Sequence, residues 1–527
     1  MLHANIILSA CAVCIWSALA GAQPAVEPRP DVAGVTLDSK GQAVRKVNLI
    51  LYPLETGPAG DPLPPYSAMS ERDGRFAFYG IAPGRYRLEA DHAGYLLTKF
   101  GAKSPWASGS TLVVRGGQTL AGIEIRMPEQ ATLAGTVACD DTVSYLGVAL
   151  LRPGYQDGQR RLTSVATVQA DADGEFSFNK LAPGRYYLAA FAGPGDPNAP
   201  DRYAGTYYPG TTDPGAAEAI DLKKGQSLSG LQLELRKSPV FRVSGTVEGV
   251  GLNPGNMFAV LRPLAASFNP VASGAMVADG AFEFKSILPG SYWLTVQAAS
   301  PSLTIVPQAV EVSSSDVTGI VLQAEPPVKL SGSVKVEGGP AAIPGLVVRL
   351  APSNPIPGAL PSATVKADGS FTLSGVAGRY RIELQHAPPE AYVKSAALGD
   401  LDALAGLDLN RAAGDSKLAI VISYAAARVS GTVRDENGKP VDGVATLIPE
   451  PPRPDQPSLY QVVETENGHF QMQGIRPGKY RLYAWEEIEP GAYLDPQFLT
   501  PHQADSMAVE VTENERKEVE LKRIPVE

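Results

Sequence analysis

The sequence contains very little cysteine. Only three cysteines occur in 527 residues, and two of them, Cys11 and Cys14, lie in the apolar N-terminal segment. Cys139 alone cannot form an intramolecular disulfide or a cysteine metal site, which excludes a disulfide-stapled scaffold. After the N-terminal segment, no apolar run is long enough to span a membrane. The stability of the chain must therefore come from hydrophobic cores.

Basic clusters and catalytic motifs are also missing. The chain has 45 basic and 55 acidic residues, a net charge of -10, with the basic residues scattered. This distribution lacks the patch that nucleic-acid binding requires. The chain has no His-Glu-x-x-His motif, no Gly-x-Ser-x-Gly elbow and no phosphate-binding loop. We therefore expect no enzyme, no catalytic residues, no metal site and no cofactor.

The N-terminus has the features of a secretory signal. Residues 6–20 are mostly apolar, and Ala20-Gly21-Ala22 fits the small-residue rule for cleavage before Gln23. The segment lacks Lys and Arg before the apolar run, so the true start codon stays open. Cys11 follows Leu-Ser-Ala as in a lipoprotein box, which leaves lipidation as an alternative. We predict a signal peptide at 1–22 and an extracellular, cell-surface or periplasmic location.

Glycine and proline, by contrast, are abundant, and they recur in a fixed pattern. The stretch DADGEFSFNKLAPGRYYL at 171–188 begins with an Asp-Gly turn. Phe176 and Phe178 then alternate with polar residues, so both rings point to one face of a strand. A Pro-Gly turn and Tyr186 begin the next strand. The stretch predicts the second half of a hairpin, a tight corner and a new strand.

The same pattern occurs five times, about 90 to 105 residues apart. The turns begin at Asp73, Asp173, Asp279, Asp368 and Asn467, and the corner tyrosines are Tyr86, Tyr186, Tyr292, Tyr380 and Tyr480. A pattern used once per unit indicates a folding signal rather than an active site. We expect the tyrosine hydroxyls to hydrogen-bond the backbone a few residues upstream, as in a tyrosine corner.

Each unit also opens with an apolar-x-Gly-x-Val strand and closes with another alternating strand. Regular short strands separated by turns are typical of β-sandwiches of about 100 residues. We predict an all-β fold, a tandem array of five immunoglobulin/transthyretin-like antiparallel β-sandwich domains. The predicted domains are 23–128, 129–237, 238–326, 327–426 and 427–527. Short, proline-containing linkers predict a string of domains with limited bends.

The units resemble the carboxypeptidase regulatory-like domain, a transthyretin-like, carbohydrate-binding-like β-sandwich. The fifth unit carries the resemblance best, with VSGTVRDENGKPVDGV at 429–444, Asn467-Gly468 and the Pro-Gly-Lys-Tyr sequence that ends at Tyr480. Such a family implies an extracellular accessory role without catalytic residues. It makes carbohydrate the favoured ligand class.

Aromatic residues supply the candidate ligand contacts. If Tyr480 and its neighbour two positions on face inward, Tyr483 and Trp485 face outward on the same strand. Exposed rings can stack on sugars, and the acids that follow at 486–487 can hydrogen-bond hydroxyls. The further candidates are Trp293 at the matching corner of the third unit, and Tyr207 and Tyr208 in a loop of the second. The alternative is that inserted loops cover these rings.

The sequence therefore predicts a non-enzymatic secreted binding or scaffold protein, with a glycan or a cell-surface protein as partner. Nucleic acid is not an expected partner, and no transmembrane segment is expected after signal cleavage. The first alternative is a structural or adhesive stalk that binds protein partners. The second is an accessory subunit of an extracellular enzyme.

Overall fold

The computed structural model describes most of the chain from residue 29 to residue 525. It leaves out 57–60, 104–106, 142, 157, 194, 250–256, 265–272, 278, 299–303, 326–327, 353–359, 376–377 and 410–416. The predicted signal peptide at 1–22, including Cys11, lies outside the described residues. Among the residues that are described, no helix is both long and apolar enough to cross a membrane.

The described chain is built almost entirely from strands, in five successive groups. The first group comprises β1 (Val32–Asp38), β2 (Asn48–Pro53), β3 (Tyr66–Met69), β4 (Arg75–Phe78), β5 (Gly84–Asp91), β6 (Thr98–Lys99), β7 (Leu112–Val114) and β8 (Leu120–Met127). The second comprises β9 (Ala131–Ala138), β10 (Leu146–Gln156), β11 (Gln159–Gln169), β12 (Glu175–Leu181), β13 (Gly184–Ala192), β14 (Asp201–Tyr203), β15 (Thr206–Tyr207), η1 (Pro214–Ala216), β16 (Ile220–Leu222), β17 (Ser227–Glu234) and β18 (Lys237–Pro239).

The remaining three groups follow the same plan. The third comprises β19 (Phe241–Glu248), β20 (Met257–Pro263), β21 (Ser273–Met276), β22 (Ala281–Ile287), β23 (Gly290–Ala298), β24 (Thr304–Ile305), β25 (Gln308–Val312) and β26 (Val317–Glu325). The fourth comprises β27 (Val328–Glu337), β28 (Val347–Pro352), β29 (Ser362–Thr364), β30 (Ser370–Gly375), β31 (Arg379–Gln385), β32 (Tyr392–Leu398), β33 (Leu401–Asp402), β34 (Leu407–Asp408) and β35 (Leu418–Ser423). The fifth comprises β36 (Ala427–Arg434), β37 (Val444–Pro449), η4 (Pro457–Leu459), β38 (Gln461–Glu464), β39 (His469–Ile475), β40 (Gly478–Trp485), η5 (Ala492–Leu494), α1 (Pro496–Leu499), η6 (Thr500–Asp505), β41 (Met507–Val511) and β42 (Arg516–Lys522).

Each group forms a two-sheet sandwich with one shared topology. In the first domain one sheet has the order β4-β1-β8, and the other contains β3-β2-β5-β6 with β7 also paired to β5. The second, third and fifth domains have related two-sheet arrangements, and in the fourth β32 and β33 extend the sheet of β30-β27-β35. The predicted all-β tandem of sandwiches is confirmed. One pair per domain differs from the antiparallel expectation, because the first and last strands pair in parallel, as in β1 with β8 and β36 with β42. Because the first and last strands are parallel, the chain enters a sandwich at one end and leaves it at the other.

The glycine in the opening strand of each unit permits this parallel pair. A Cβ at Gly34 would lie 2.2 Å from the carbonyl oxygen of Ile123 on β8 and 2.6 Å from the Phe76 ring. A Cβ at Gly135 would lie 2.2 Å from the Leu231 carbonyl oxygen. Only glycine allows the closing strand and an aromatic ring to approach the backbone this closely.

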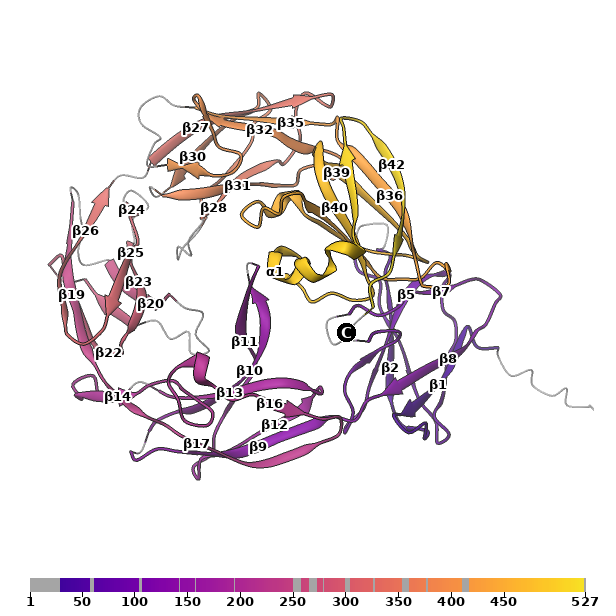
Figure 1. Ribbon diagram of the computed structural model, residues 1–527, viewed down its shortest axis with the longest axis horizontal. Helices are drawn as coiled ribbons and strands as arrows, with labels where there is room; N and C mark the ends of the chain where they lie inside the picture. The colour runs from indigo at the N-terminus through magenta and orange to yellow at the C-terminus, as the bar shows by residue number, and fades with distance from the viewer. Residues whose placement is uncertain are drawn as a thin grey trace, which may run out of the picture.

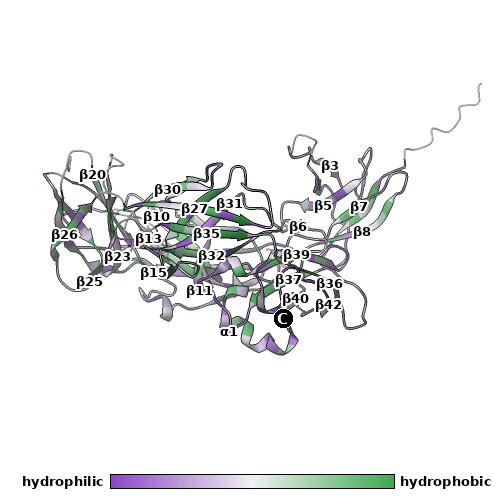
Figure 2. Ribbon diagram, turned by 90° about the horizontal axis from the view of Figure 1, so that it is seen from above, coloured by the Kyte–Doolittle hydropathy of each residue, from purple (hydrophilic) through white to green (hydrophobic). Residues whose placement is uncertain are grey.

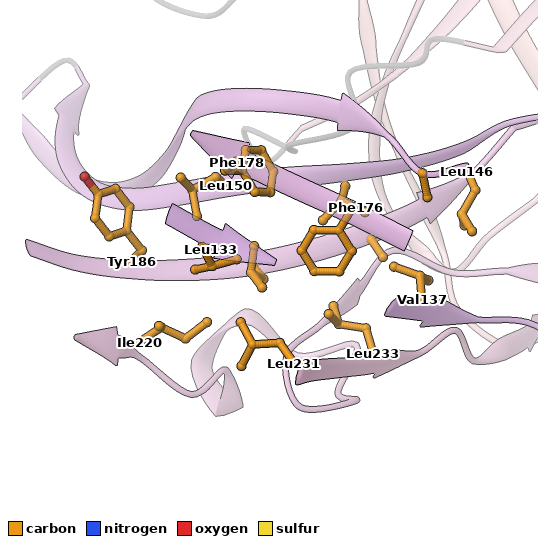
Figure 3. Packing of buried hydrophobic residues seen from close by; sticks show 14 of the residues in the cluster. Leu133, Val137, Leu146, Leu150, Phe176, Phe178, Tyr186, Ile220, Leu231 and Leu233 are labelled. Atoms are coloured by element: carbon orange, nitrogen blue, oxygen red, sulfur yellow. The ribbon is translucent and has the colours of Figure 1, made fainter. Parts of the chain in front are cut away.

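The alternating residues fill the cores as predicted. In the second domain Phe176 and Phe178 point into the sandwich from β12, with their ring centres 6.0 Å apart (Figure 3). Leu133 from the opening strand and Leu150 from β10 pack beside them. Burial of such apolar side chains stabilises a sandwich by roughly 1.5–3 kcal/mol each.

The tyrosine-corner hypothesis is confirmed in four domains. The Tyr186 hydroxyl donates a hydrogen bond to the carbonyl oxygen of Ala182 at 2.9 Å. The hydroxyls of Tyr86, Tyr292 and Tyr480 each donate to the carbonyl four residues upstream, at 2.8, 2.7 and 2.8 Å. Each bond ties the Pro-Gly corner to the strand that follows it.

The five sandwiches curve into a closed ring instead of extending as a string (Figure 1). The joints are short, since β8 ends at Met127 and β9 begins at Ala131, while β18 ends at Pro239 and β19 begins at Phe241. At the first joint, Gln130 N–H donates to Gly94 O, which fixes the bend. Seen from above, β7 and β8 lie at the same end of the molecule as β36 and β42 (Figure 2). The predicted domain boundaries themselves stay a prediction.

Removing one corner hydroxyl should destabilise one domain. We expect Tyr186→Phe to lower the free energy of unfolding of the second domain by about 1–2 kcal/mol, because the Ala182 carbonyl loses its partner. Burial raises the pKa of Tyr186 above its ordinary value of 10.0. A raised pKa contributes stability that is complete below pH 10 and is lost as the pH rises further. Denaturant unfolding at pH 7 and at pH 11 measures how much the free energy of unfolding falls between the two pH values. This fall should be smaller in Tyr186→Phe than in the native chain. Equal falls in the two chains would contradict the tyrosine corner.

Candidate interaction sites around the fifth domain

The predicted aromatic surface of the fifth domain is buried. Tyr483 and Trp485 are each only 3% exposed, and their rings stack with centres 5.3 Å apart. The Trp485 Nε1–H donates to Thr446 Oγ1 at 3.0 Å. The prediction that both rings are exposed is therefore wrong. The rings do lie on the face opposite the main core, as the alternation predicts, but another segment covers that face.

The cover is the segment between β40 and β41, which contains η5, α1 and η6. Phe498 and His502 contact the Trp485 ring, with centres 5.4 and 5.0 Å away. The segment thus builds a second hydrophobic core on the outer face of the sheet. Its buried members are Ile448, Tyr460, Tyr483, Trp485, Leu499 and Ile524. The apolar residues between 488 and 499 were the sequence signal for this cover, as the alternative of an inserted loop had anticipated.

The other aromatic candidates are partly covered and lie far from this site in the chain. Trp293 is half-buried on β23, opposite Arg262 of β20. Tyr207 and Tyr208 are half-buried in the second domain, and Tyr208 packs against its core. The structure does not gather these residues with Tyr483 and Trp485 into one surface. Ligand binding by any of them stays a prediction.

A long hairpin of the second domain docks on the same cover. Strands β10 and β11 project into the middle of the ring, toward α1 (Figure 1). The Tyr155 ring meets the Phe498 ring at 5.9 Å, and Arg152 Nη2 lies 3.2 Å from Glu489 Oε1. The fifth domain therefore contacts the second domain across the ring interior.

An ion-pair interface joins the first domain to the fifth. Arg85 pairs with Glu466, and Arg87 pairs with Glu464 on β38. Lys103 Nζ also lies 2.5 Å from Glu486 Oε1. In all three pairs the first domain supplies the cation and the fifth domain supplies the carboxylate. Each exposed ion pair contributes less than about 1 kcal/mol to stability. A network of complementary charges nevertheless fixes how the two domains align with each other.

A cavity of about 580 Å³, with charged side chains such as Arg87 and Glu464 in its wall, lies at this interface. Its walls include Glu486 and Glu487, the two acids that the sequence placed beside the aromatic candidates, and the Tyr493 side chain. Two buried atoms on the wall, Arg87 Nε and Glu487 Oε2, have no hydrogen-bond partner among the residues that the structure describes. Buried polar atoms normally have partners, so this cavity is suited to a ligand or water that both accepts and donates hydrogen bonds.

A second cavity, of about 470 Å³, lies between the fourth and fifth domains. Its fourth-domain wall contains apolar side chains such as Ile382, Leu384 and Val393. The fifth domain contributes the loop around η4 and the corner at Arg476. Charged side chains, among them Arg381 and Arg476, also line this cavity. A concave site that combines apolar walls with polar groups is the usual form of a binding pocket. Sequence reasoning missed both cavities, because they form only where domains meet.

Neither a metal site nor an activated thiol emerges from the described residues. No group of three or more His, Cys, Asp or Glu side chains in this part of the chain is arranged to hold a metal ion. Burial, followed by the neighbouring carboxylates of Asp141 and Asp140, raises the pKa of the Cys139 thiol. A raised pKa makes a thiol a weaker nucleophile at neutral pH.

Comparisons with known proteins show similarity in fold alone. No protein-family model matches the chain, and no curated protein matches its sequence. Among solved structures, the streptococcal ancillary pilin is 14% identical with a TM-score of 0.22, covering 56% of this chain and 99% of the pilin. The minor pilin of Streptococcus agalactiae is 13% identical, with a TM-score of 0.22 and coverages of 40% and 96%. The full-length major pilin of Streptococcus pneumoniae is 9% identical, with a TM-score of 0.19 and coverages of 93% and 99%.

Truncating the central tryptophan should unfold the second core. We expect Trp485→Ala to destabilise the fifth domain by about 3–5 kcal/mol, the usual cost of removing a buried large aromatic side chain. Cleavage by chymotrypsin, for which Tyr493 and Phe498 are sites, should then increase in the 486–506 segment. It should also increase at Tyr155 in the β10–β11 hairpin, because the docking surface of the hairpin is lost. Trp293→Ala, at a half-buried site in another domain, is the matched control. Unchanged cleavage and melting in Trp485→Ala would show that the ring is exposed in solution.

Reversing the charges of the first domain should open the ring. In Arg85→Glu/Arg87→Glu, like charges face each other across the interface, so the radius of gyration measured by small-angle X-ray scattering at low salt should rise. Adding Glu464→Arg and Glu466→Arg to the same chain should restore it. Arg185→Glu is the control, because its partner Asp221 lies within the second domain. If the variant with all four substitutions stays as expanded as the double mutant, the ion-pair interface is refuted.

Proposed function

We propose that this chain is a non-enzymatic secreted or cell-surface scaffold that binds a protein partner. The observation that supports this proposal is the position of the fifth domain, which contacts the first, second and fourth domains at once. Five related sandwiches are thereby held in a fixed frame, and both cavities lie at junctions of that frame. The predicted signal peptide supports export, and the strand pattern supports a relationship to carboxypeptidase regulatory-like domains.

The burial of the aromatic candidates favours a protein partner over a glycan. The glycan hypothesis depended on an exposed pair, Tyr483 and Trp485, and these rings are inside the second core. The cavity between the fourth and fifth domains is instead lined mainly by aliphatic side chains. Aliphatic walls suit the side chains of a peptide better than the hydroxyls of a sugar.

Glycan binding remains the second candidate because of the cavity between the first and fifth domains. A sugar hydroxyl both accepts and donates hydrogen bonds. One hydroxyl-rich ligand can therefore satisfy both Arg87 Nε and Glu487 Oε2, which have no hydrogen-bond partner in the described part of the chain. The Tyr493 ring on the same wall offers a surface for a sugar face. The hypothesis of an enzyme accessory subunit has no comparable support.

An adhesion assay separates the two partners. Beads coated with the mature chain should bind cells of the source organism. We expect protease treatment of the cells to abolish binding and mild periodate oxidation, which destroys sugar diols, to leave it nearly unchanged. Beads coated with heat-denatured chain are the control for non-specific adsorption. Binding that survives protease but is lost after periodate would reject the protein partner in favour of a glycan.

A further inference from the structure

Strand β31 of the fourth domain has an open edge. In the third and fifth domains, the equivalent strands β23 and β40 pair over five residues with β25 and β41, respectively. In the fourth domain β34 pairs with β31 only at Arg379 and Tyr380. The intervening strand β32 has joined the other sheet beside β35. Within the described part of the chain, no strand pairs with this edge of β31 beyond Tyr380.

The main-chain N–H and C=O groups that face this edge can be assigned to individual residues of β31. Leu409 N–H donates to Gly378 O at 2.8 Å, so the carbonyl of Gly378 points toward the edge occupied by β34. Main-chain groups alternate sides along a strand, so those of Ile382 and Leu384 point toward the same edge. An edge with exposed N–H and C=O groups is a template for another strand.

The cavity between the fourth and fifth domains wraps around this open edge. Ile382 and Leu384 line it from the core face of β31, and Arg381 and Glu383 line it from the opposite face. A strand that paired with the edge would send alternate side chains into the apolar interior and onto the polar face.

The cavity wall carries charges of both signs, with Arg381 and Arg476 against Glu383 and Asp455. Arg381 Nε is buried without a hydrogen-bond partner, and Arg381 forms no ion pair within the described chain. Its neighbour Glu383 already pairs with Arg349 at 3.4 Å. Arg476 reaches the cavity from the fifth domain, whereas the acid on that side, Asp455, is exposed at the rim. Arg381 is half-buried, and a carboxylate is a strong acceptor for the buried Nε–H of its guanidinium.

We propose that the open edge of β31 binds an extended peptide of a protein partner as an added strand. Apolar side chains of the peptide enter the cavity beside Ile382 and Leu384, and an Asp or Glu on the other face pairs with Arg381. This inference rests on the proposed function and names the partner's binding element. Affinity comes from main-chain hydrogen bonds, and specificity comes from the cavity and the acid.

Peptide display tests the proposal without knowledge of the natural partner. Random heptapeptides on phage are selected against the full mature chain. We expect the enriched sequences to alternate apolar residues with at least one Asp or Glu. The most enriched peptide is then synthesised with both ends blocked, so that only its side chains carry charge, and its affinity is measured by calorimetry.

Two neighbouring arginines provide a matched pair of variants. Arg381→Gln should weaken binding about 10- to 100-fold, the usual effect of losing a hydrogen bond to a charged group. Arg379→Gln should leave the affinity unchanged, because Arg379 lies on the same strand but outside the cavity. Methylating alternate peptide nitrogens should abolish binding, since it blocks the ladder. Hydrogen exchange at 381–385 should slow when the unmodified peptide binds.

Several results would overturn this proposal. Selection that enriches no alternating acidic peptide would do so, as would equal binding to the native chain and to Arg381→Gln. Full affinity of the methylated peptide, or displacement of the peptide by decanoate alone, would show a pocket for small carboxylates instead of a strand site. Cell adhesion that is protease-sensitive but unchanged in Arg381→Gln would reject this site and leave the scaffold function standing. Adhesion that is insensitive to protease would reject the scaffold function itself.

Discussion

The parallel pairing of the first and last strands in every sandwich sets the architecture of the whole molecule. It requires a glycine where the closing strand's carbonyl approaches the opening strand, as at Gly34 and Gly135. It also places entry and exit at opposite ends of each domain. Short joints then repeat a similar bend at each step, and repeated bends of one sense close a ring. The ion pairs between the first and fifth domains, and the cavity beside them, exist because the ring closes.

The repeated fold was readable from the sequence because its signals are local. Turn dipeptides, period-two alternation and the corner tyrosines act within about twenty residues, and each is satisfied inside one sandwich. The parallel end pair was missed, because it joins residues about 90 apart, such as Val35 and Glu124, and neither strand's alternation reveals its direction. Ring closure was missed for the same reason: each linker was correctly short, but its bend depends on contacts such as Gln130 N–H to Gly94 O.

The aromatic candidates show how a correct local inference can give a wrong site. Alternation placed Tyr483 and Trp485 on the outer face of β40, and they do lie there. Exposure, however, depends on what else packs on that face. The segment after Trp485 carries Phe498 and Leu499, and burying them with the two rings removes apolar surface from water on both sides. An outward-facing aromatic pair followed by a long apolar insertion therefore indicates a second core more often than a ligand platform.

The open edge of β31 likewise depends on what pairs with or covers a strand. A sandwich is stable when every strand edge is paired, covered or charged, and four domains pair the edge that the fourth leaves open. The fifth domain does not fill the gap with a strand of its own. It places the η4 loop and Arg476 beside the gap, which leaves a cavity with charged side chains in its wall. A domain junction can thus create a binding site that neither sandwich contains alone, which explains why five copies of one structural motif need not have five copies of one function.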